Sequence, residues 1–220
     1  MIYEVVSPDA PIQQGDILFP IPMIEPPQLD SVELLSEDGV VSCKWLSVTQ
    51  DGSGDKIIAT KINPVWGIVA TQNCDAIRAP EISCFFIGEF YSVTCLNKPT
   101  TPEKGIKEIV SQTQRNNKWF YLPPDSEIGF TQPMAANFLR IFQLDRDSLE
   151  KDIAVLRKGR LNSIAYEHYR ECISQHFRRY SFNPWYPLSQ GEFESYRDGI
   201  KDEHEKAAML PYDWQKNTTL

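Results

Sequence analysis

Turn signals divide the first hundred residues into several short apolar runs, and this spacing limits the fold more than any other feature of the sequence. A Gly-Asp pair precedes the first run, and a glycine-rich segment at residues 50–54 separates the next two, as in a hairpin. Short strands at such intervals favour a small β-barrel over a doubly wound sheet. The predicted strands are residues 17–19, 40–48, 56–62, 67–71, 83–88 and 91–96, the last being a separate strand or a bend of the one before.

After residue 100 the pattern becomes mixed. Residues 119–122 and 138–144 predict two more strands, and Asp147 followed by Glu150 has the spacing of a helix-capping box. Apolar side chains at steps of three and four predict a helix over residues 162–180. We therefore expect an α+β protein with a barrel domain over residues 1–146 and a helical extension, residues 147–220, packed on it.

Length and composition exclude several classes of protein. The chain has 220 residues, of which 41% are hydrophobic, which is enough for one medium-sized domain with a core. No apolar run approaches the ~18 residues of a membrane span, and the first residues do not resemble a secretory signal. The five cysteines are irregularly spaced and contain no CxxC pair. We expect a cytoplasmic protein with reduced thiols and no membrane partner.

The charge is unevenly distributed along the chain. The net charge of −8 argues against non-specific coating of nucleic acid. Residues 140–180 nevertheless carry a local charge of +3. Such a stripe is either a solvated helix face or a surface for nucleic acid or an acidic protein. Its central residues are Arg157, Lys158, Arg160, Arg170, Arg178 and Arg179.

Three segments together resemble the MazF/PemK-like toxins. These are QGDILF at residues 14–19, GIVATQNCD at residues 67–75 and the apolar run at residues 83–87. The resemblance covers residues 12–96, implies an SH3-like barrel, and places an insertion at about residues 26–60. The TQxCD motif is similar to that of a subgroup of uncharacterised bacterial proteins, which implies a toxin–antitoxin or antiphage-defence setting.

The chain departs from the toxins at the positions that carry their chemistry. RNA-cleaving members place an arginine and a proline before the central strand, and a threonine or serine after the next one. The resemblance aligns these positions with Val65, Trp66 and Gly88. Cleavage through a 2′-hydroxyl needs a proton acceptor and a cation, which these residues do not supply. We therefore expect that the chain is not a MazF-type ribonuclease.

The segment Gln72-Asn73-Cys74-Asp75 follows a predicted buried strand and is the first candidate site. Asn73 and Asp75 can make turn hydrogen bonds while Cys74 packs beneath the barrel. The same side chains, with Arg78, can line a binding cleft. Cys74 can also act as a nucleophile if His168 or His176 serves as its base.

A second pattern is His168, Cys172 and His176, which recur every four residues on the predicted helix. A pair at i and i+4 can bind zinc, but three such ligands extend over ~12 Å of helix. The face they share is also apolar, which favours core packing. The sequence has no glycine-rich nucleotide motif and no calcium loop, so we expect no metal and no cofactor.

These observations favour a non-catalytic binding or adaptor protein of a bacterial toxin–antitoxin or antiphage-defence system. A protein partner is expected, with RNA or DNA as the alternative. The competing hypotheses are a diverged MazF-like endoribonuclease toxin and a hydrolase that uses Cys74 with a histidine. The candidate catalytic residues of an enzyme are Cys74 and Asp75. The expected binding residues are Gln72, Asn73, Cys74, Asp75, Arg78, Arg157, Arg160, Arg178 and Arg179.

Overall fold

The computed structural model describes residues 2–37, 39–50, 56–115, 118–177 and 190–199. The chain divides into two units, residues 1–172 and 173–220. The first unit holds both β-sheets of the described residues, and in the second the structure describes the end of α6 (Ser163–Phe177) and α7 (Gln190–Gly199). The protein is therefore a mixed α+β protein, as predicted.

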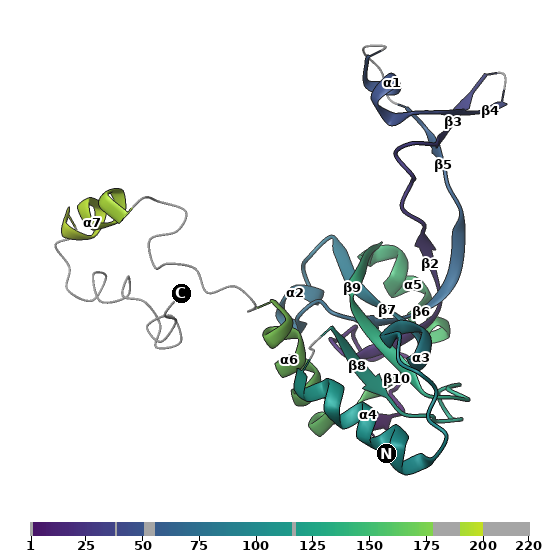
Figure 1. The fold of residues 1–220 in the computed structure, drawn as a ribbon, viewed down its shortest axis with the longest axis vertical. Coiled ribbons are helices and arrows are strands. Elements are labelled where there is room, and N and C mark those ends of the chain that lie inside the picture. Colours follow the sequence, from purple (N-terminus) through teal and green to yellow (C-terminus); the bar gives the residue numbers. More distant parts are fainter. Residues whose placement is uncertain (1, 38, 51–55, 116–117, 178–189, 200–220) are drawn as a thin grey trace. The chain divides into compact units, whose positions relative to one another are not determined.

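The main sheet has seven antiparallel strands in the order β1-β10-β2-β6-β7-β9-β8 (Figure 1). Its outer strands come close at one point, because the Tyr3 hydroxyl on β1 donates a hydrogen bond to the Pro123 carbonyl just after β8, at 2.8 Å. The strands are β1 (Tyr3–Glu4), β2 (Asp16–Ile24), β6 (Ile62–Val69), β7 (Glu81–Glu89), β8 (Trp119–Leu122), β9 (Met134–Asp145) and β10 (Arg157–Leu161).

A second, three-stranded sheet occupies the region where an insertion was expected. It has the order β4-β3-β5, with β3 (Val32–Ser36), β4 (Gly39–Cys43) and β5 (Ile58–Ala59). The ladder between β2 and β6 continues to the Ile24–Ile62 pair, so these two strands lead into the second sheet (Figure 1). We call the residues between them, 25–61, the arm.

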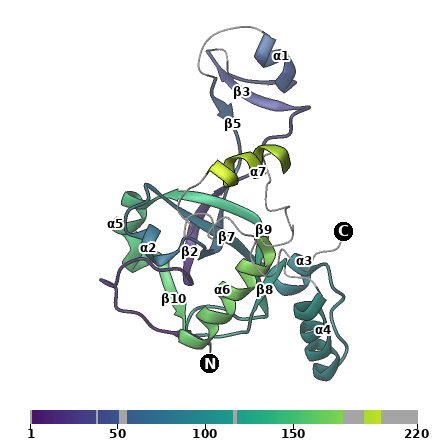
Figure 2. The same ribbon diagram turned by 90° about the vertical axis from the view of Figure 1, so that its left-hand side faces the viewer.

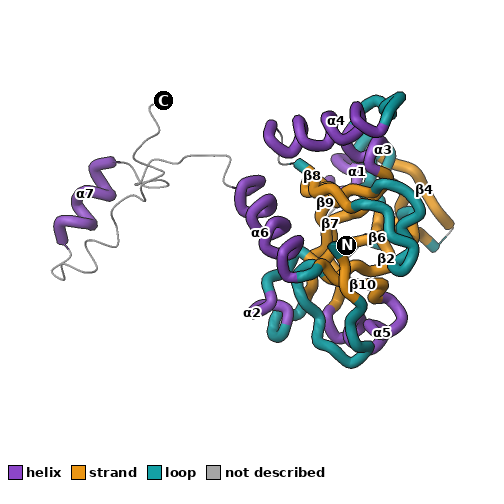
Figure 3. The backbone as a smooth tube through the Cα atoms, turned by 90° about the horizontal axis from the view of Figure 1, so that it is seen from below, coloured by secondary structure: helices purple, strands orange, loops and turns teal. Residues whose placement is uncertain are grey.

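Helices cover parts of the main sheet. α5 (Arg146–Leu156) packs on β2 and β9, and α3 (Phe90–Thr94) packs on β7, β8 and β9 (Figure 2). α4 (Pro102–Arg115) and α6 lie beside β8 (Figure 3). The remaining helices are the short α1 (Trp45–Gln50) and α2 (Asn73–Ala76).

The core lies between the main sheet and these helices. One cluster includes Leu18, Ile21 and Val69 from the sheet and Leu149 and Ile153 from α5, and all five side chains are buried. β7 contributes the alternate residues Ile82 and Cys84 to this cluster, as the period of a β-strand requires, whereas β2 shifts its register between Leu18 and Ile21. The predicted strands at residues 17–19, 83–88, 119–122 and 138–144 lie within strands of the main sheet, and that at residues 67–71 overlaps the end of β6, which stops at Val69.

Three predicted strands are partly or wholly wrong. Of residues 56–62, only Ile58–Ala59 (β5) and Ile62, where β6 begins, lie in strands, and β3 separates β5 from β4, so the two do not form the expected hairpin. Residues 40–48 are a strand only to Cys43, after which α1 begins at Trp45. Residues 91–96, which alternate like a strand, lie mostly in α3. α3 turns back closely on β7, since a Cβ atom at Gly88 would lie 2.9 Å from the Val93 side chain. Only glycine leaves room for this approach.

The helical extension expected from residue 147 also differs from the structure. α5 begins one residue earlier, and its cap is Asp145, whose carboxylate accepts the Ser148 amide at 2.8 Å. Residues 157–161 form β10, which lies inside the main sheet between β1 and β2. The sequence RKGRL does not look like a buried strand. Its two arginines can be buried because each pairs with the buried carboxylate of Asp16.

Candidate functional site

The expected site at residues 72–75 lies at the start of the four-residue helix α2. The Asn73 side chain accepts the Gln14 amide at 2.8 Å and donates to the Tyr166 hydroxyl at 3.2 Å. These two contacts connect the start of α2 with the segment before β2 and with α6. They are long-range bonds and not the turn hydrogen bonds that were predicted for Asn73. Gln72 precedes the helix, with its side chain exposed.

Cys74 is exposed, so the prediction that it packs beneath the sheet is wrong. Ala76 takes that place and is 2% exposed. Asp75 pairs with Arg78 at 3.0 Å, and both side chains remain largely in solvent. An exposed pair of this kind contributes little free energy and holds its charges weakly in place.

Arg157 and Arg160 lie on β10 around the carboxylate of Asp16 and do not form a surface stripe. Asp16 is fully buried, and the Arg157 and Arg160 side chains are only 4% and 11% exposed. The Arg157 Nε atom lies 3.2 Å from Asp16 Oδ2, and Arg160 binds the other carboxylate oxygen. Burial lowers the pKa of Arg157, and the Asp16 charge opposes that shift.

These arginines also hold the segment before β2. Arg157 donates to the carbonyl of Ala10 at 2.8 Å, and Arg160 donates to that of Pro11 at 2.9 Å. Both side chains therefore serve internal contacts, because a buried guanidinium requires a counter-charge and hydrogen-bond acceptors. A binding role for them would require this network to open.

The other described basic residues of the expected stripe have separate partners. Lys158 donates to the Val155 carbonyl at 2.9 Å, and Arg170 pairs with Glu167 at 3.2 Å. Arg178 and Arg179 lie outside the described residues. Each of the four described basic side chains of the predicted stripe thus has a partner within the chain.

His168 and Cys172 line an apolar groove of about 540 Å³ between α4, β8 and α6. The His168 ring packs edge-on against Phe120, with ring centroids 5.5 Å apart. Among the described residues, no group of three histidine, cysteine or acidic side chains is placed to hold a metal ion. The pattern of His168, Cys172 and His176 thus supplies no metal centre in the part of the chain that the structure describes.

We expect the Cys172 thiol to react slowly with alkylating reagents at neutral pH. Burial, with a smaller contribution from Glu171, raises its pKa to about 11. Because the thiolate is the nucleophile, a raised pKa lowers its reactive fraction, and the rate should rise about tenfold per pH unit up to that value. Iodoacetamide labelling between pH 7 and 10, followed by peptide mass spectrometry, measures this.

The unfolded chain is the control for that experiment. In urea the Cys172 rate should level off near pH 8.5–9, the ordinary range of a cysteine thiol. A plateau at the same pH in the folded protein would contradict the structure.

The positions that the toxin resemblance assigns to catalysis are filled by apolar groups. Val65 lies in the core cluster. The Trp66 ring stacks on Phe19, with centroids 4.5 Å apart, and contacts Phe130 at 4.8 Å. Gly88 lies on β7 beneath α3. None of these three residues carries a group that transfers a proton or binds a phosphate.

The arm contains the surface that sequence reasoning missed. α1 covers one face of the three-stranded sheet, where Val32 and Val48 are 1% and 7% exposed. On the other face Leu35 lies opposite Val40 of β4, and its amide donates to the Ile57 carbonyl at 2.9 Å. Leu35, Val40 and Ile57 are 53%, 58% and 63% exposed. We call these three side chains the apolar row.

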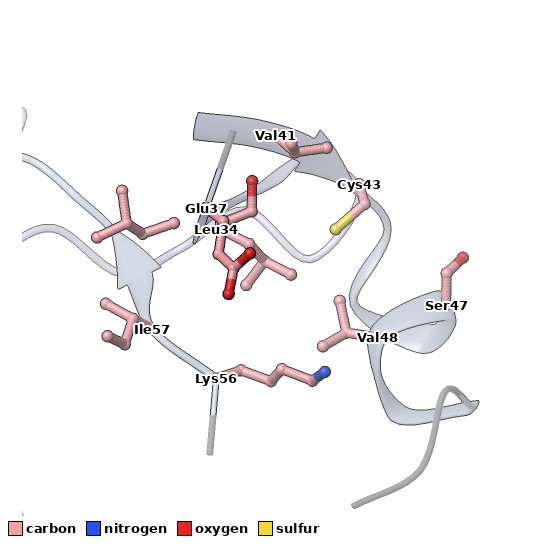
Figure 4. Close-up of a pocket in the computed structure, with 10 residues that line it drawn as sticks. Leu34, Glu37, Val41, Cys43, Ser47, Val48, Lys56 and Ile57 are labelled. Carbon is pink, nitrogen blue, oxygen red and sulfur yellow. The ribbon is translucent and has the colours of Figure 1, made fainter. Parts of the chain in front are cut away.

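A hollow of about 860 Å³ lies beside α1. Figure 4 shows the side chains of Glu37 and Cys43 directed toward it, with Val48 on the opposite wall and Lys56 at its edge. The sequence signal for this region was the pair of adjacent apolar residues at 34–35 and again at 40–41. Two adjacent apolar residues in a strand place one apolar side chain on each face of the sheet. A sheet with only one covered face would need apolar residues at alternate positions only.

Comparison with known proteins gives this chain no family. A scan against protein-family models finds no match, and a search of curated proteins finds no significant match. In the described residues, no helix is both long and apolar enough to cross a membrane.

Proposed function

We propose that this chain is a non-catalytic adaptor that binds a protein partner through the apolar row of its arm. In this proposal the main sheet is an elaborated SH3-like barrel, and the protein serves a bacterial toxin–antitoxin or antiphage-defence system. The barrel is the rigid support, and the arm carries the recognition surface. The three observations below support the proposal.

The apolar row carries the main argument. Its three side chains lie next to one another across three adjacent segments of one sheet, and more than half of each is exposed. Single exposed apolar residues are common, but contiguous ones on an uncovered sheet face are typical of protein-binding surfaces. Burying such a row against a partner should stabilise the complex by roughly 25 cal/mol for each Å² of apolar surface removed from water.

Charge favours a protein over a nucleic acid as the partner. Residues 25–61 contain seven acidic residues and three lysines, a net charge of −4. Glu33 lies in the strand that carries Leu35, on the same face of the sheet, and is exposed. The net negative charge of this segment disfavours a phosphate backbone. The exposed Glu33 beside the apolar row favours a partner with lysine or arginine around an apolar centre.

Two further contacts agree with a barrel that has no catalytic role. The Tyr3–Pro123 hydrogen bond brings the two edges of the main sheet together at one point, which supports a sheet that curves toward a barrel. Val65 and Trp66 occupy the toxin-type positions without offering an acid, a base or a cation. This combination supports a scaffold that keeps a toxin-like framework and uses it for binding.

The test is co-purification of the tagged chain from its native host, comparing Ile57→Lys with Ile106→Lys. Both isoleucines are 63% exposed, but Ile106 lies on α4, away from the apolar row. We expect a stoichiometric protein partner with the parent chain and with Ile106→Lys. Ile57→Lys should reduce recovery at least about tenfold, which corresponds to ~1.4 kcal/mol of binding free energy.

Three outcomes would contradict the proposal. Equal partner loss in both variants would mean that the apolar row is not the binding surface. A nuclease-sensitive partner would identify a nucleic-acid-binding protein, and recovery with RNA fragments of uniform ends would indicate an enzyme. Circular dichroism of both variants checks that each remains folded.

A further inference from the structure

The outer edge of β4 is an unpaired strand of the arm. Among the described residues β4 pairs only with β3, and it stands at the end of its sheet. Its sequence is Gly-Val-Val-Ser-Cys, without charge or proline, and Val40 and Val41 are 58% and 50% exposed. Natural proteins usually protect such an edge with a charge, a proline or a covering element, because it is a template for another strand.

The direction of the backbone hydrogen bonds shows which N–H and C=O groups of β4 point toward its open edge. The Leu35 amide of β3 donates to Ile57, on the β5 side. Because backbone groups alternate in direction along an antiparallel strand, Leu34 faces β4 and bonds to its partner Val41. The amide and carbonyl of Val40 and of Ser42 therefore point away from β3, toward the open edge.

We propose that a second copy of this chain pairs with β4 in antiparallel fashion, so that two arms form one continuous sheet. The register that uses all the outward groups sets Val40 opposite Ser42 of the other copy. By the two-fold symmetry, Ser42 then faces the other Val40, and both pairs exchange their N–H and C=O groups. The Val41 side chains of the two copies meet at the centre of the pairing.

The charges at the two ends of β4 complement each other in this arrangement. Glu37 lies in the turn before β4, and Lys44 follows its last residue, with both side chains exposed. Antiparallel pairing brings the end of one β4 beside the start of the other, so Lys44 of each copy approaches the acidic turn of its neighbour. A parallel partner strand of the same sequence would instead place like charges together, which disfavours that alternative.

The other strand edges are less suited to such pairing. β5 and β1 have only two residues each, and β8 lies beside α4 and α6. With five residues, β4 is therefore the longest edge strand in the described residues. The interface is small, so we expect association at micromolar or higher concentration rather than an obligate dimer.

The experiment is the molar mass of the full chain by light scattering after size exclusion, loaded at about 100 µM and after serial dilution. The chain has a mass of 25.2 kDa, and we expect twice that value at high concentration, falling to the monomer on dilution. Glu37→Lys and Lys44→Glu should each weaken association at least about tenfold, since each places like charges together at both ends of the pairing.

The double variant Glu37→Lys, Lys44→Glu is the decisive sample. Exchanging the two charges recreates the opposite-charge contacts, so it should dimerise like the parent chain. Lys56→Glu, an exposed lysine just before the β5 edge of the same sheet, is the matched control and should leave the dimer unchanged. Val40→Pro removes an outward donor without removing a bond to β3, and should abolish the dimer.

The result that overturns the proposal is a monomeric parent chain at every concentration. A dimer that persists equally in Glu37→Lys, Lys44→Glu and Val40→Pro would place the interface elsewhere and overturn it as well. The two charge variants separate the dimer from the adaptor proposal, because Glu37→Lys and Lys44→Glu leave all three side chains of the apolar row in place and Ile57→Lys leaves the β4 edge intact. Val40→Pro changes a residue of the apolar row and is therefore used for the dimer alone. A monomer that still binds a partner would reject the dimer alone.

Discussion

Asp16→Asn should lower the free energy of unfolding by about 3–5 kcal/mol, the largest effect we expect from a single polar substitution. The Asp16 carboxylate is fully buried between Arg157 and Arg160, and it also accepts the Gln13 amide at 3.0 Å. Asparagine keeps the shape and removes the charge, so two buried guanidinium groups lose their counter-ion. The measurement is urea unfolding followed by circular dichroism, with linear extrapolation to water.

Asp75→Asn is the control for that substitution. Asp75 also pairs with an arginine, at 3.0 Å, but both side chains are exposed, so the loss should stay below about 1 kcal/mol. Similar losses in the two variants would show that burial of the Asp16 network contributes no special stability. A strong loss for Asp16 alone would also confirm that Arg157 and Arg160 are structural residues.

Tyr169→Ala should lower the free energy of unfolding by about 3–5 kcal/mol, because it removes a large side chain from the core. Tyr169 on α6 is 0% exposed, and its ring lies 5.3 Å from that of Phe120 and 6.1 Å from that of Phe138. The substitution would leave a cavity where the Tyr169 ring of α6 contacts Phe120 of β8 and Phe138 of β9. The same urea experiment measures the change.

Tyr169→Phe separates packing from hydrogen bonding at this position. The hydroxyl donates to the Val69 carbonyl at 3.2 Å, and that carbonyl also accepts the Gly15 amide at 3.0 Å. Removing the hydroxyl therefore leaves the carbonyl with one donor, and we expect a loss of about 1 kcal/mol. A Phe variant as unstable as the Ala variant would mean that the hydrogen bond, not the ring, anchors α6.

The two proposals about the arm reinforce each other. When two β4 strands pair in antiparallel fashion, the same face of each arm lies on the same side of the joined sheet. The apolar rows of both copies therefore lie on the same side. A dimer would then present two partner-binding rows on one continuous surface. A partner with two matching sites would bind such a pair more tightly than either row alone, through effective concentration.

The sequence by itself determined the local elements whose periodicity is clear. The runs at residues 67–71 and 83–88 are apolar enough to be buried strands in any antiparallel sheet, and they lie in β6 and β7. Proline at residue 123 ends the aromatic strand β8 at Leu122, as its missing amide requires. The α+β class followed from these patterns.

Only the tertiary structure decided the role of the charged residues. Arg157 and Arg160 have the composition of a surface stripe, but both pair inside the sheet with Asp16, which lies more than 140 residues earlier in the chain. The predicted surface position of Arg157 and Arg160 is wrong because charge pairing depends on distance in space, which the order of residues does not give. The apolar row was hidden for the same reason: Leu35, Val40 and Ile57 become neighbours only when three strands align.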